Sequence, residues 1–158
     1  MNEISDLRKK LETANLDRAE LVGKLIDAYY DRFGEEAIQI ARRVLRQRGI
    51  SMGEKIRLLM GGRVSDLRTF RENLTNVLGT TSKGEKVINE QTHLEVKVTY
   101  CPWVDAWKRA GLNSELLCDI ISESDIGVAE GASKNMICTS DHGLARGRNS
   151  CKIEWKLG

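Results

Sequence analysis

The sequence predicts an α+β fold in which N-terminal helices are followed by a small, mainly antiparallel sheet with two interleaved helices. In the first half, apolar residues recur every three to four positions, which is typical of amphipathic helices. From Thr92 to Cys101 the apolar period changes to two, which indicates a half-buried strand. Strands that are apolar on one face only favour an antiparallel sheet. At 158 residues the chain suits a single domain, with a helical region (1–90) and a mixed strand and helix region (91–158).

Four helices are predicted in the first half, at residues 3–31, 35–48, 53–60 and 65–78. Gly49 follows a row of arginines and is interpreted as a helix stop. Ser51 and Glu54 match the Ser-x-x-Glu capping box, so a new helix is expected to begin there. Residues 79–90 are polar and are interpreted as a connection without regular structure.

The second half alternates strands with helices. We expect a strand at 92–101, a helix at 102–111, a helix from Asn113 or Ser114 that fades after Asp125, and strands at 136–139 and 150–157. Pro102 ends the first strand and suits the first position of a helix. His142, between Asp141 and Gly143, is expected in a turn that is mobile enough for catalysis or simply exposed to solvent.

Composition limits the possible functions. No apolar run approaches the roughly 18 residues of a membrane span, so we expect a cytoplasmic protein whose four cysteines are reduced. The net charge of +2 is too small to indicate a nucleic-acid partner. The arginines of residues 42–48, followed by Gly49 and a capped helix, give a helix–turn–helix-like outline, which is a weak signal for DNA binding.

The first helix carries apolar residues at heptad spacing. Ile4, Leu7 and Leu11 keep this spacing, and Leu21 and Leu25 resume it after a break at Arg18. An unbroken series would indicate a coiled coil. Two interpretations stay open, namely a helix that packs on its own domain and the seam of a homodimer.

Cysteine and histidine residues are the first candidates for chemistry. Cys101, Cys118, His142 and Cys151 follow the spacing C-x16-C-x23-H-x8-C, which contains no C-x2-C pair of the kind that identifies zinc sites. If the fold brings them together, they could hold a transition metal such as zinc, or form a Cys–His nucleophile. The alternative is packing, because free cysteine is among the most buried residue types.

Charged side chains of the same half are the second candidates. Glu115, Asp119 and Glu123 repeat at intervals of four, and Asp125 follows them. These carboxylates could bind a cation or position water, or form a solvated helix face. Arg146 and Arg148 could hold a substrate carboxylate in bidentate fashion, or be exposed loop residues.

Three segments carry a resemblance to a known family. Cys101-Pro102, Leu117-Cys118-Asp119 and Gly147-x3-Cys151 resemble motifs of the L-2-amino-thiazoline-4-carboxylic acid hydrolase-like family. That resemblance implies hydrolytic opening of a cyclic amidine to an N-carbamoyl amino acid. The closing part of the chain also looks like the 4-vinyl-reductase-type ligand-binding domain, which implies small-molecule binding and a metal site.

The resemblance places Cys101, Cys118 and Cys151 at motif positions. We infer His142 as the acid or base, and we expect substrate contacts from Asp119, Trp103, Arg146 and Arg148. An enzyme of this kind should lose turnover on Cys101→Ser. The alternative is a non-catalytic domain that binds or senses a small molecule or a metal and dimerises through residues 3–28.

Overall fold

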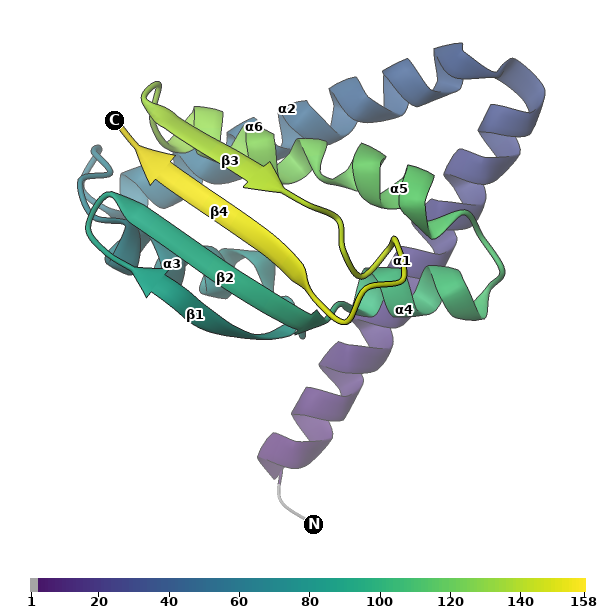
Figure 1. Cartoon of the computed structure of the whole chain (residues 1–158), viewed down its shortest axis with the longest axis horizontal. Helices are drawn as coiled ribbons and strands as arrows, with labels where there is room; N and C mark the ends of the chain where they lie inside the picture. The colour runs from purple at the N-terminus through teal and green to yellow at the C-terminus, as the bar shows by residue number, and fades with distance from the viewer. Residues whose placement is uncertain (1–2) are drawn as a thin grey trace.

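The structure is a computed structural model that describes residues 3–158 (Figure 1). Its elements in chain order are α1 (Glu3–Phe33), α2 (Glu35–Leu59), α3 (Leu67–Leu78), β1 (Lys83–Asn89), β2 (His93–Tyr100), α4 (Pro102–Arg109), α5 (Ser114–Ile121), α6 (Glu123–Ala132), β3 (Met136–Ser140) and β4 (Cys151–Leu157). Helices pack on one face of a four-stranded sheet, so the α+β prediction is confirmed. Among the described helices, none has the length and apolar character needed to cross a membrane.

The sheet has the strand order β1-β2-β4-β3, and each neighbouring pair is antiparallel. The alternation predicted for β2 holds, because Leu94, Val96 and Val98 are buried. On β4, Trp155 pairs with Leu94 and Cys151 pairs with Val98, so both strands turn the same face toward the helices. These residues form one core with α3 and α6.

The predicted break in the second helix is wrong. Residues 35–59 form one continuous helix, α2, and Gly49 lies buried inside it. The Ser51 hydroxyl donates to the carbonyl of Gln47 at 3.2 Å, so Ser51 is an interior helix residue and not a cap. Because residues 49–52 are helical, no turn separates the two halves, and the helix–turn–helix outline for DNA binding is wrong as well.

Glycine is required at residue 49 by the packing of α2 against α6. A Cβ atom at Gly49 would lie 2.1 Å from the Ser124 carbonyl oxygen, and one at Gly53 would lie 2.2 Å from that of Val128. The relation is reciprocal, since a Cβ at Gly127 or at Gly131 would lie 2.2 Å or 2.0 Å from a carbonyl oxygen of α2. Two glycines four residues apart on each helix therefore let the two backbones touch.

Two further elements differ from the sequence prediction. Residues 83–89 form the edge strand β1, although they had been interpreted as a polar connection. Its side chains are almost all exposed, and its two apolar side chains, Val87 and Ile88, are adjacent, so the strand lacks the apolar alternation that marks β2. The sheet has three interleaved helices instead of the two predicted, because a separate helix, α6, follows α5 and precedes β3. Only Ser122 lies between α5 and α6.

The middle of α1 is anchored to the rest of the chain. The indole N–H of Trp107 on α4 donates to the carbonyl of Ala19 at 2.8 Å, and Gly23 leaves room for the same indole. The buried side chain of Asn15 donates to the carbonyl of Gly79 at 3.1 Å. The N-terminal end of α1 extends away from the sheet (Figure 1). Apolar side chains along α1 remain exposed, namely Leu7, Leu11, Leu21 and Leu25.

Gly53→Ala tests the α2–α6 contact. In an open helix, alanine would stabilise by about 1 kcal/mol. Here the added methyl group meets backbone atoms that belong to another helix, so we expect the free energy of unfolding to fall by about 3 kcal/mol or more. Urea unfolding followed by circular dichroism measures the change. Gln47→Ala, at an exposed position of α2, is the control and should change stability by less than about 0.5 kcal/mol. Equal effects of the two substitutions would contradict the packing argument.

Pairing of two copies through α1 stays a prediction. The exposed leucines of α1 lie on one side of the helix, which is the arrangement of a coiled-coil seam. We expect a concentration-dependent dimer in sedimentation velocity, and loss of that dimer in a Leu7→Glu, Leu11→Glu variant. The control is Lys9→Glu, at an exposed position between them. A wild-type chain that remains a monomer up to about 100 µM would rule out a dimer of ordinary affinity.

Candidate functional site

A cavity of about 240 Å³ lies between the inner face of the sheet and the helices α3, α4, α5 and α6. Its wall is mainly apolar, and its volume is close to the lower end of the range for small-molecule sites. The apolar lining comes from Leu74 and Leu78 of α3, Val96 and Val98 of β2, Trp103, Val104 and Trp107 of α4, Ile121 of α5, and Ile153 and Trp155 of β4. The sheet and the helices that cover it therefore both contribute to the wall of one cavity.

The four candidates from the cysteine and histidine pattern all line this cavity. Cys101 precedes α4, Cys118 lies in α5, His142 follows β3, and Cys151 begins β4. They come together because β2 and β4 are adjacent and because α4 and α5 follow directly from β2. Trp103, the predicted substrate contact, lines the same cavity.

The cysteines are neutral thiols rather than activated nucleophiles. Burial raises the pKa of Cys101 and of Cys151, and it raises the pKa of Cys118 to about 12. Cys101 is the N-cap residue of α4. Its thiol makes no side-chain cap hydrogen bond. Backbone N–H groups at the start of α4 lower the pKa of Cys101, but burial raises it by more. A nucleophilic cysteine requires the opposite shift, so these surroundings argue against a thiolate at neutral pH.

Metal binding by these four residues receives no support from the geometry. Within residues 3–158, only one group of three or more histidine, cysteine or acidic side chains has its ligand atoms within 4.8 Å of one another, and it consists of His93, Glu95 and Glu154. That group lies on the opposite face of the sheet from the cavity. Lys152 and Lys156 pair with its carboxylates at 3.6 Å and 3.1 Å, so its charges are balanced without an ion.

His142 is buried rather than exposed, so the expectation of a solvent-exposed turn histidine is wrong. The residue is 9% exposed and adopts a left-handed backbone conformation with φ of 53°. The Asp141 carboxylate fixes the turn by accepting from the backbone N–H of Gly143 at 3.1 Å and of Lys152 at 2.8 Å. Burial raises the pKa of Asp141, but these backbone N–H donors outweigh that effect and lower it.

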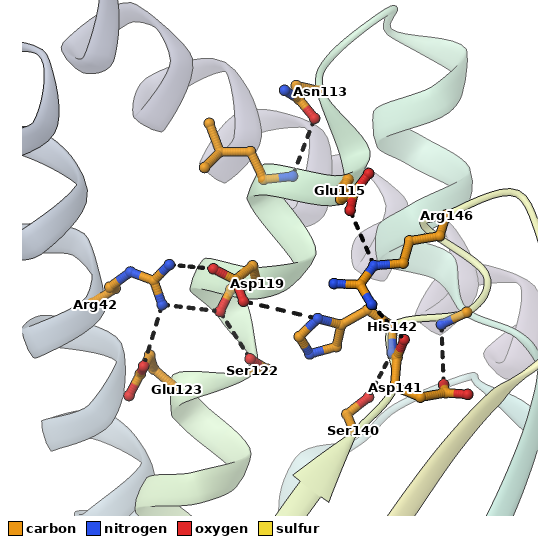
Figure 2. Close-up of polar contacts among 12 residues, drawn as sticks. Arg42, Asn113, Glu115, Asp119, Ser122, Glu123, Ser140, Asp141, His142 and Arg146 are labelled. Carbon is orange, nitrogen blue, oxygen red and sulfur yellow. Dashed lines mark hydrogen bonds and ion pairs between the residues drawn. The ribbon is translucent and has the colours of Figure 1, made fainter.

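Asp119 stands beside the imidazole of His142. Its Oδ1 lies 3.9 Å from Nδ1 of His142, while its other oxygen accepts from Arg42 (Figure 2). Burial lowers the pKa of His142, and the Asp119 charge opposes that shift only in part. The imidazole is therefore neutral at pH 7, and Asp119 is placed to stabilise the imidazolium that forms when His142 accepts a proton.

The remaining predicted substrate contacts lie outside the cavity wall. Arg146 donates to Glu115 at 3.0 Å, and Arg148 pairs with Asp141 at 3.0 Å, so each guanidinium already has a carboxylate partner (Figure 2). Asp119 does not line the cavity either and reaches it only through His142. The carboxylate row predicted from its spacing is a set of ion pairs that joins α5 and α6 to α2 and to the turn that follows His142.

Arg71 and Trp155 line the cavity, although the sequence analysis did not single them out as site residues. Trp155 alternates with outward-facing residues on its strand, and Arg71 follows Phe70 on an ordinary amphipathic helix. Asp125, which belongs to the predicted carboxylate group, lines the same cavity. No local pattern shows that Nε of Arg71 and Nε1 of Trp155 are buried without a partner, because this depends on the folded chain.

Asp125→Asn tests the burial of this carboxyl group. Burial raises its pKa from 3.8 to about 6, so the folded state binds the proton more tightly than the unfolded state. Stability is therefore lost as the pH rises from about 4 to 6, and the ionised group costs about 3 kcal/mol at pH 8. We expect Asp125→Asn to raise the free energy of unfolding by up to that amount at pH 8 and by almost nothing at pH 4.

Urea unfolding at the two pH values measures this difference. The matched control is Glu115→Gln, which removes an exposed carboxylate from α5. It should leave the pH dependence of stability nearly unchanged, because exposed ion pairs contribute little. An Asp125→Asn protein that is less stable than the wild type at both pH values would show that the carboxyl has a stabilising partner.

Similarity to known proteins supports the family and the fold. The family model described as L-2-amino-thiazoline-4-carboxylic acid hydrolase matches residues 15–155. The phenol-responsive sensory domain of the transcription activator PoxR, solved with phenol, is similar with a TM-score of 0.59 and 16% identity, covering 88% of this chain and 74% of that one.

A trafficking protein particle complex subunit 3 from Naegleria fowleri, covalently bound to palmitic acid, is similar with a TM-score of 0.52 and 16% identity, covering 89% of this chain and 95% of that one. At this identity both likenesses show the fold alone. No curated protein sequence matches the chain. Because the family model covers nearly the whole sequence, the resemblance seen in the cysteine motifs is confirmed: the chain belongs to the L-2-amino-thiazoline-4-carboxylic acid hydrolase family.

Proposed function

We propose that this protein binds a small heterocyclic molecule in its cavity and opens the ring by hydrolysis. The substrate class is a cyclic amidine of the 2-amino-thiazoline-4-carboxylate type, and the product is an N-carbamoyl amino acid. Family membership supports this class of reaction. The observation that carries the proposal is the imidazole of His142, which lies in the wall of a small cavity with the Asp119 carboxylate beside it and a pKa lowered by burial.

His142 is the general base of the proposed reaction. A base must be unprotonated at working pH, and burial keeps the pKa of His142 below its ordinary value. No residue of the described chain hydrogen-bonds to Nε2 of His142, so that nitrogen is available to accept a proton from water. Asp119, next to Nδ1, stabilises the positive charge that then develops.

The proposed step is balanced with water as the only co-reactant. The water oxygen bonds to the amidine carbon of the ring while His142 takes one of its protons. The bond between that carbon and the ring sulfur then breaks, and the imidazolium returns its proton to the sulfur. As the carbonyl forms, the second water proton passes from the attacking oxygen to the ring nitrogen, which was double-bonded to the carbon. The products are a carbamoyl group on the amino nitrogen and a free thiol, so the reaction can be followed by thiol release.

The cysteines shape the cavity in this proposal and form no covalent intermediate. Their raised pKa values support this role, because a neutral thiol is a weak nucleophile. Cys101 and Cys151 also lie among apolar side chains of the core. All four cysteines are free, which agrees with the cytoplasmic location that we propose for the protein.

A non-catalytic binding or sensing domain is the second candidate. It is favoured by the similarity to a phenol-responsive sensory domain and by the absence of an activated thiol among the described cysteines. In that case His142 would contact the ligand without transferring a proton. The two candidates differ in one measurable respect, since only the enzyme releases a thiol.

Thiol release from 2-amino-thiazoline-4-carboxylate tests the proposal. We expect turnover by the wild type, a loss of at least about 100-fold in kcat for His142→Gln, and a change of less than about fivefold for Cys101→Ser. Arg43→Gln, at an exposed position of α2, is the control substitution and should leave kcat unchanged. Turnover that survives His142→Gln but is abolished by Cys101→Ser would replace the water mechanism with a thiol nucleophile.

Binding without thiol release would favour the sensing domain. Calorimetry with the same compound supplies that arm of the experiment, because it detects a complex whether or not the ring opens. If the compound neither binds nor releases a thiol, the ligand of this family member belongs to another chemical class.

A further inference from the structure

The first unexplained group in the cavity wall is Arg71, a partly buried arginine without an acid partner. Arg71 of α3 donates from Nη1 to the Thr75 hydroxyl at 2.9 Å, but its Nε is buried and has no partner in the described chain. It makes no ion pair with a described residue, whereas six other arginines do, namely Arg42, Arg46, Arg68, Arg109, Arg146 and Arg148. A buried cation without a counter-charge is costly, so the site is incomplete without an anion.

The second group is an indole N–H that lacks an acceptor. Trp155 of β4 is 4% exposed and lines the cavity, and its Nε1 has no partner in the described chain. Buried tryptophan normally finds an acceptor, as Trp107 does with the Ala19 carbonyl. Arg71 and Trp155 thus both line the cavity, and each carries one N–H donor without a partner in the described chain.

The third group has the opposite charge. Asp125, in the first turn of α6, lines the cavity and is partly buried, and burial raises the pKa of its carboxyl group to about 6. No described residue donates a hydrogen bond or an ion pair to its carboxyl group. Asp125 and Arg71 line one cavity but do not pair with each other, since the structure contains no such contact within 4.0 Å among the described residues. The cavity therefore has separate positions for a cation and for an anion.

We propose that the cavity selects small zwitterions, in which Arg71 and Trp155 bind the carboxylate of the ligand and Asp125 binds its amidinium or ammonium group. This inference rests on the proposed function, because it takes the same cavity as the substrate site. It names the residues that determine specificity and limits the substrates to cyclic amidines that carry an acid. A ligand with only one of the two charges would leave Asp125 or Arg71 unpaired.

Three probes separate the two charges. The zwitterion is 2-amino-thiazoline-4-carboxylate, the cation is 2-amino-thiazoline, and the anion is thiazole-4-carboxylate. Binding is measured by calorimetry at pH 7.5 with His142→Gln present in every protein, so that ring opening does not consume the zwitterion. The variants are Arg71→Gln, Asp125→Asn and Trp155→Phe, and the control is Arg68→Gln, an exposed arginine on the same helix as Arg71.

We expect the zwitterion to bind at least about tenfold more tightly than either other probe. Arg71→Gln should weaken the binding of the zwitterion and of the anion by about 10-fold to 100-fold and change the binding of the cation by less than twofold. Asp125→Asn should weaken the binding of the zwitterion and of the cation by the same factor and leave the binding of the anion within twofold. Trp155→Phe should weaken the binding of the zwitterion and of the anion by about threefold to tenfold. Arg68→Gln should leave the affinity for all three probes unchanged.

Equal effects of Arg71→Gln on all three probes, or on none, would overturn the assignment. So would tighter binding of phenol than of the zwitterion, which would indicate a site for neutral aromatic ligands. Thermal unfolding by circular dichroism verifies that each variant is folded before its affinity is compared.

The two proposals fail in different ways. If the zwitterion binds with the expected dependence on Arg71 and Asp125 but the wild type releases no thiol, hydrolysis is wrong and the recognition site stands. If thiol is released and KM is unchanged by Arg71→Gln and Asp125→Asn, hydrolysis stands and the recognition site is wrong.

Discussion

The direct contact between the backbones of α2 and α6 is the constraint on which the rest of the structure depends. Gly49 and Gly53 face Gly127 and Gly131, and a methyl group at any of these positions would overlap a backbone carbonyl. Because α6 leads into β3 and the chain then continues to β4, this contact also fixes the helices relative to the sheet. Arginines of α2 reinforce it by pairing with carboxylates along α5 and α6, as Arg46 does with Glu123 at 2.7 Å.

A cavity remains between the sheet and the helices, and α6 contributes Ser124 and Asp125 to its wall. Two of its polar groups lower the stability of the folded chain, because burial raises the pKa of Asp125 and leaves Nε of Arg71 without a partner among the described residues. Groups that are costly in the free protein are the ones that a complementary ligand can satisfy.

The elements with strong periodicity could be predicted from the sequence. Strand β2, the proline at the start of α4, the Asn113 cap of α5 and the antiparallel sheet were all expected, because each depends on neighbouring residues. Elements whose structure depends on residues far away in the chain could not be predicted in this way. Gly49 has the local character of a helix stop, and the exposed strand β1 has no apolar pattern, so only their packing against α6 and β2 defines them.

For the candidate site, the sequence by itself determined the family and the cysteine and histidine residues that line the cavity. Residue type and spacing suffice for that, since the motifs are local. The tertiary structure decided which side chains remain without partners. Arg146 and Arg148 looked available but have carboxylate partners, whereas Arg71 looked ordinary and has none. Whether a charge is paired depends on residues far apart in the chain, and only the folded arrangement brings them together.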